Sequence, residues 1–129
     1  LQLPAHQGLW RAAEDTATDF MGRLAVVPMV LEARGLDVTP NMIRLFKQAK
    51  QASAVAALET IYAEEVAHVA YGSKWFHFMC GRENLDPKVA FHELVQKYFH
   101  GQLKPPFNEE KRAEAGIPPD FYWPLAVAT

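Results

Sequence analysis

Cysteine, long apolar runs and an excess of charge of one sign are all scarce in this chain of 129 residues. Cys80 is the only cysteine, so no disulfide can form within the chain, and we expect a reducing compartment such as the cytoplasm. The longest apolar run, residues 24–31, is interrupted by Pro28 and falls short of the ~18 residues that a membrane span needs. We therefore expect no association with a membrane.

Charge and glycine patterns exclude two further classes of function. The formal net charge is −2 and the basic residues are scattered, so the chain lacks the basic surface that binds nucleic acid. The sequence contains no glycine-rich loop for a phosphate, no alternating strand pattern and no repeat of fixed period. The length of 129 residues fits one domain over residues 1–129, and 50% hydrophobic residues are typical of a globular protein. With helical spacing and no strand pattern, the chain is predicted to be all-α.

The first long segment with helical spacing covers residues 9–34. Its apolar residues follow one another in steps of three and four and form one stripe: Trp10, Ala13, Ala17, Phe20, Leu24, Val27 and Leu31. Pro28 has no N–H group, so we expect a kink one turn before Glu32. We expect Gly35 to end this helix in the left-handed conformation.

The second long helix, over residues 53–79, is the strongest prediction. Its seam again alternates steps of four and three: Ala54, Leu58, Ile61, Glu65, His68, Gly72, Trp75 and Met79. A straight helix of this length spans about 40 Å, and we expect it to pack antiparallel to the first. Gly81 is expected to end it.

Shorter elements complete the predicted fold. Thr39 and Pro40 are a typical N-cap and first residue for a helix over residues 41–50, and Asp86 and Pro87 are the same for a helix ending near residue 100. A third short helix is expected over residues 109–115. The proline-rich residues 102–129 are predicted to be an extended tail that packs on the helical residues 1–101, because its aromatic side chains need burial.

Glu65 and His68 occupy seam positions that an apolar residue would normally fill. Spaced three apart on a helix they point the same way, and burying them is costly unless they are paired or bind a metal. Four-helix bundles with two metals take one Glu from each of two helices and a Glu-x-x-His from each of the other two. With Glu32 on the preceding helix, the chain carries half of such a ligand set, suited to iron, manganese or zinc.

A satisfied polar core is the alternative to a metal site. In that case Glu65 pairs with Arg34 or Arg23, and His68 donates to a backbone carbonyl or to Glu64. Glu-x-x-His is a weak motif on its own, because it occurs often by chance. The pattern by itself leaves both alternatives open.

Four blocks of sequence resemble the DUF455 family of ferritin-like proteins: residues 3–10, 23–40, 64–76, and 105–108 with 115–116. The resemblance covers nearly the whole chain but only the C-terminal part of the family domain, and it implies a ferritin-like helical bundle in part. By position, Glu32 corresponds to the carboxylate of the third bundle helix, and Glu65 and His68 to the motif of the fourth. The chain departs from the family at Glu64, where an Asp is usual, and near residues 50–51, where Gly-Asp is usual.

The resemblance implies a half-bundle whose two long helices leave an apolar seam exposed. Either a missing N-terminal half covers this seam, or a second copy does in a homodimer. The complete bundle is expected to hold a dinuclear iron or manganese centre with oxidase- or hydroxylase-type redox chemistry. The alternatives are a metal-free helical scaffold or interaction module, or an inactive fragment of a longer enzyme.

Overall fold

The computed structural model describes residues 11, 14, 16 and 19–127. It contains the α-helices α2 (Phe20–Val26), α3 (Ala33–Gln48), α4 (Ala52–Arg82), α5 (Pro87–Tyr98), α6 (Glu109–Glu114) and α7 (Pro119–Tyr122), the π-helix η1 (Val27–Glu32) and the 3₁₀-helix η2 (Trp123–Leu125). Within this part of the chain the only β-type pairing is an isolated bridge between Leu103 and Ala126. The all-α prediction is confirmed; residues 9–18 of the first predicted helix lie mostly outside the described residues.

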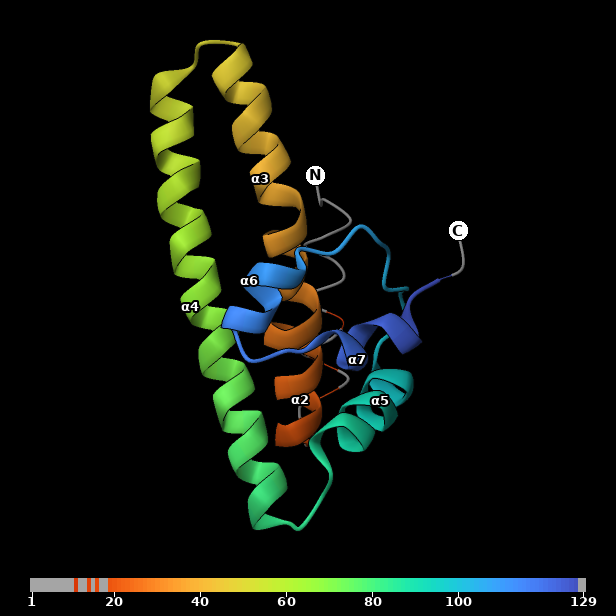
Figure 1. Ribbon diagram of the computed structural model, residues 1–129. Helices are drawn as coiled ribbons and strands as arrows, with labels where there is room; N and C mark the ends of the chain where they lie inside the picture. Colours follow the sequence, from red (N-terminus) through yellow and green to blue (C-terminus); the bar gives the residue numbers. More distant parts are fainter. Residues whose placement is uncertain (1–10, 12–13, 15, 17–18, 128–129) are drawn as a thin grey trace.

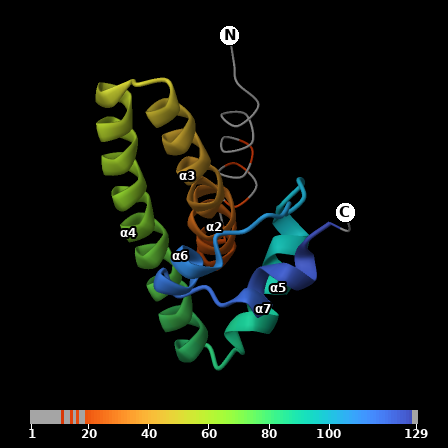
Figure 2. The ribbon, with the colours of Figure 1, turned by 45° about the horizontal axis from the view of Figure 1, so that its top comes forward.

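Three helical segments, α2, η1 and α3, follow one another without a break and run alongside α4 in both ribbon views (Figures 1 and 2). The predicted end at Gly35 is therefore wrong, and so is the separate helix over residues 41–50, because Gly35 and Pro40 lie inside α3. A helix-interior glycine costs only about 1 kcal/mol. The fully buried Ala33 and Leu36 pack against the core on either side of Gly35, and this burial outweighs that cost.

The kink predicted at Pro28 takes the form of a π-helix. Pro28 lies in the first turn of η1, and the N–H of Ala33 donates to the Pro28 carbonyl five residues earlier. Since Pro28 has no N–H, it cannot donate to the Leu24 carbonyl, and the helix widens there instead of continuing in α geometry. Glu32 is the last residue of this widened turn.

Helix α4 confirms the prediction for residues 53–79, although it ends three residues later, at Arg82. Gly81 remains helical, and the chain turns at Asn84, which has a φ of 58°. The buried residues of this helix are Val69, Gly72, Ser73, Phe76 and Cys80. The core face is therefore rotated from the predicted seam, whose members Ile61 and Trp75 are 52% and 44% exposed.

The C-terminal segment, residues 102–127, contains α6, α7 and η2 rather than being extended throughout (Figure 1). Within it, α6 packs against α3 and α4, and α7 packs against α5. The predicted short helix agrees with α6, and the predicted helix after Asp86 agrees with α5, where the Asp86 carboxylate accepts from the N–H groups of Lys88 and Val89. Phe121 and Tyr122 are buried in the core. None of the described helices combines the length and hydropathy that a bilayer span needs.

Candidate metal centre

The structure brings the three predicted ligands together across two antiparallel helices. Glu32 ends η1, while Glu65 and His68 lie near the middle of α4. One donor atom from each residue lies within 4.8 Å of the other two. Glu32 and Glu65 are partly buried and His68 is exposed, so the cluster lies at the edge of the helix pair rather than deep within the core.

Within the described residues, neither carboxylate of this cluster forms an ion pair with a lysine or an arginine. Arg34, one of the two proposed partners of Glu65, instead contacts Asp37 at 3.5 Å and the Lys104 carbonyl at 2.7 Å. The polar-core alternative therefore loses its Arg34–Glu65 pair.

The pKa of Glu65 is raised from its ordinary value. Burial of the carboxyl group is the main cause and the nearby charge of Glu32 adds to it, while His68 acts in the opposite direction. Holding two ionised carboxylates close together where they are partly buried lowers the stability of the metal-free protein. A bound cation would offset that cost.

Two close helix approaches flank the cluster. On one side, a methyl group added at Gly35 would lie 3.4 Å from Cγ of Glu65, which is ordinary contact, so the Glu65 side chain lies directly over α3 there. On the other side, a methyl group added at Gly72 would lie 2.5 Å from Cβ of Pro28 and closer still to its Cγ. The Gly72 backbone and the Pro28 ring are therefore in direct contact, one turn before Glu32.

His68 lies in the middle of an exposed row of side chains on α4. The members are spaced by steps of three and four, and every one is exposed: Ile61, Glu64, His68, Tyr71, Trp75 and Phe78. We call these six residues the α4 stripe. Helical geometry places Val38, Met42 and Leu45 of α3, which are also exposed, on the same side of the antiparallel pair. The cluster is therefore open toward an apolar face.

The other side of the helix pair is covered by the C-terminal segment, through contacts that the sequence did not predict. Arg112 donates to both carboxylate oxygens of Asp37, at 2.9 and 2.7 Å, and its guanidinium lies over the rings of Phe107 and Tyr122. Ser73 of α4 donates to the Gly116 carbonyl at 3.1 Å. No local sequence signal identifies these pairs, because the partners are 75 and 43 positions apart.

His77 and Cys80 lie outside the acidic cluster and pack within the helical structure. Nδ1 of His77 lies 2.8 Å from the Ser73 carbonyl, and its ring stacks on Phe121. Cys80 is buried, and burial raises the pKa of its thiol. Glu64 is exposed, and no hydrogen bond joins it to His68 in the part of the chain that the structure describes.

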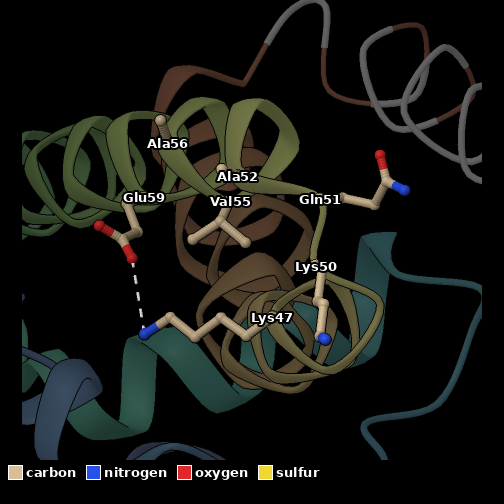
Figure 3. Close-up of a pocket in the computed structure, with 7 residues that line it drawn as sticks. All are labelled: Lys47, Lys50, Gln51, Ala52, Val55, Ala56 and Glu59. Atoms are coloured by element: carbon tan, nitrogen blue, oxygen red, sulfur yellow. Dashed lines mark ion pairs between the residues drawn. The ribbon is translucent and has the colours of Figure 1, made fainter.

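The end of the α3–α4 hairpin forms an open pocket of about 420 Å³, separate from the acidic cluster (Figure 3). Its lining residues are Lys47, Lys50, Gln51, Ala52, Val55, Ala56 and Glu59. Lys47 and Glu59 form an ion pair across it at 3.7 Å, with both side chains more than half exposed. An exposed pair of this kind contributes little to stability, and the pocket contains none of the predicted ligands.

Residues 2–123 match the sequence model of a family described as "Protein of unknown function (DUF455)". An uncharacterized protein of Haemophilus influenzae is 42% identical over 113 residues, which make up 88% of this chain and 39% of that protein. The chain thus spans well under half the length of this curated relative. No solved structure matches the chain. Since the family match extends over nearly all of its residues, the chain belongs to the DUF455 family.

Proposed function

We propose that Glu32, Glu65 and His68 supply half the ligands of a dinuclear iron or manganese centre in a ferritin-like helical bundle. The observation that carries this proposal is the convergence of one donor atom from each residue within 4.8 Å, from two different helices. Carboxylate and imidazole donors fit both metals. The number and spacing of the donors match those that one helix pair contributes to a bundle of this kind.

In the complete centre, Glu32, Glu65 and His68 would hold the metals from this helix pair. When bound, the metals supply redox chemistry of the oxidase or hydroxylase type. The chain's own residues set the geometry: α4 holds Glu65 and His68 on one side, and η1 holds Glu32 opposite them.

The remaining ligands must come from beyond this helix pair, because three donors do not complete a dinuclear site. A second copy would add another Glu32, Glu65 and His68. This chain leaves 61% of the Haemophilus influenzae protein unmatched (100 − 39). That unmatched part would also add the missing ligands if it carries equivalent residues. The exposed α4 stripe is where either would pack.

Metal content tests the proposal. The purified chain, alone and joined to the N-terminal region of a longer relative, is measured for iron, manganese and zinc alongside its mass in solution. Glu65→Ala should lose the metal, whereas Glu64→Ala, at the exposed neighbouring position, should retain it. Stoichiometric metal that persists in Glu65→Ala would contradict the ligand assignment.

A metal-free helical interaction module is the second candidate, favoured by the extent of the exposed apolar face. Tyr71 is 66% exposed and Phe78 is 57% exposed, which is unusual for large side chains on one helix of a protein without partners. The same measurement separates the candidates. A folded, partnered protein without any metal supports the module and rejects the centre.

A further inference from the structure

Pro28 of η1 and Gly72 of α4 are in direct contact beside the acidic cluster. Pro28 precedes Glu32 by four residues in η1, and Gly72 follows His68 by four residues in α4. A Cβ atom at position 72 would lie 2.5 Å from Cβ of Pro28 and closer to Cγ. Both ring atoms belong to a rigid side chain fixed to the backbone, so neither can move aside without moving η1.

Neither residue is favourable where it lies if local helix stability alone is considered. Glycine in the interior of a helix costs about 1 kcal/mol relative to alanine, and an interior proline costs about 3 kcal/mol. Gly81, in the same helix, shows the contrast, because a Cβ added there meets nothing within 4 Å. Close packing against Pro28 therefore explains a glycine at position 72, whereas no such packing explains the glycine at position 81.

We propose that Pro28 and Gly72 are positioning residues for the candidate metal centre, and this inference rests on the proposed function. The missing side chain at Gly72 lets the Pro28 ring seat directly on the α4 backbone. The seated ring holds the π-helical turn against α4, and that turn ends at Glu32. Separating the helices here moves the Glu32 carboxylate away from Glu65 and His68, whose donors now lie within 4.8 Å of it.

Gly72→Ala and Gly81→Ala form a matched pair that tests this. Both replace a helical glycine of α4 by alanine, the best helix former, so both favour the helix locally. The experiment uses whichever form binds metal, either the chain alone or the chain joined to the N-terminal region of a longer relative. Co²⁺ is added stepwise, and its binding is followed by its visible absorption, which reports the coordination geometry. We expect Gly72→Ala to lose tenfold or more in Co²⁺ affinity and to change the absorption spectrum, the range seen when ligand orientation is disturbed. Gly81→Ala should match the unsubstituted protein in both.

A crystal structure of metal-free Gly72→Ala gives a readout that does not depend on metal. We expect the Glu32 and His68 donor atoms to lie farther apart than 4.8 Å. Unchanged donor spacing, or Co²⁺ affinity and spectrum equal to those of Gly81→Ala, overturns the inference. If the unsubstituted protein binds no Co²⁺, the proposed function fails, and the donor spacing alone then decides whether Pro28 and Gly72 position these side chains.

Pro28→Ala keeps the inference testable if Gly72→Ala does not fold. This substitution restores the N–H group at position 28 and removes the ring from the Gly72 backbone, so both constraints on η1 are lost. We expect the same loss of Co²⁺ affinity while helical circular dichroism is retained. Co²⁺ binding equal to that of the unsubstituted protein would overturn the inference.

Discussion

Arg112 and Asp37 form a two-point ion pair between α6 and α3, with side chains only 3% and 1% exposed. The N–H of Asn108 also donates to Asp37 at 2.8 Å, and the Asn108 amide donates to the Leu36 carbonyl and to the Tyr62 hydroxyl. A buried charge pair is stable only while both partners are present. The attachment of the C-terminal segment to α3 therefore depends on both side chains together.

Arg112→Ala should lower the free energy of unfolding by as much as about 3–5 kcal/mol, because the buried Asp37 then loses its two-point partner and keeps only the longer contact with Arg34 at 3.5 Å. Urea unfolding followed by circular dichroism measures this. Lys111→Ala is the matched control, since Lys111 makes only a surface pair with Glu114 and its loss should have little effect. Equal effects of the two substitutions would show that the Asp37–Arg112 pair has no special role.

Glu65→Gln should make the metal-free protein more stable at pH 7. The pKa of Glu65 is raised in the folded state, so its contribution to stability is present below the ordinary value of 4.5 and is lost as the pH rises through the folded-state pKa. The neutral amide avoids that loss. We expect a gain of no more than about 1 kcal/mol, from urea unfolding at a series of pH values.

The gain from Glu65→Gln should disappear below pH 4.5, where the carboxyl group is protonated in both folded and unfolded chains. Glu64→Gln, at the exposed adjacent position, should show no such pH dependence. A Glu65→Gln variant that is less stable than the unsubstituted protein at pH 7 would mean that the charge of Glu65 is already compensated.

Trp75→Lys should disrupt whatever packs on the α4 stripe, because a charged side chain would replace a large apolar one there. We expect the mass in solution, from light scattering after gel filtration, to fall or the tendency to aggregate to decrease. Val89→Lys is the control, since Val89 is exposed to a similar extent, 48%, but lies on α5. Identical behaviour of the two variants would place the association elsewhere.

Cys80 should react slowly with thiol reagents in the folded protein. The side chain is fully buried, and burial, followed by the charge of Asp86, raises the pKa of the thiol, so the reactive thiolate is scarce at neutral pH. The reaction rate with a chromogenic disulfide should rise at least a hundredfold in urea. A fast reaction without denaturant would indicate local opening of α4 near its end.

Local pattern predicts much of this fold and much less of its packing. The spacing of residues 53–79 predicts α4, and the fixed three-residue interval places Glu65 and His68 on one side of it. The helix boundaries predicted at Gly35 and Pro40 were wrong, because burial of residues such as Leu36 outweighs the free-energy cost of glycine and proline inside a helix. The core face of α4 could not be predicted, since it depends on where the C-terminal segment lies, and contacts such as Ser73 with Gly116 set that position.

In the proposed centre, the exposure of His68 would make ligand binding and helix association two parts of one equilibrium. A metal that takes donors from both sides of the apolar face binds only while that face is covered, so the free energy it contributes appears equally in the affinity of the helices for each other. Each tenfold gain in one affinity is then a tenfold gain in the other. A chelator would act on such a protein as a dissociating agent, and its effect would depend on protein concentration if the covering helices belong to a second copy.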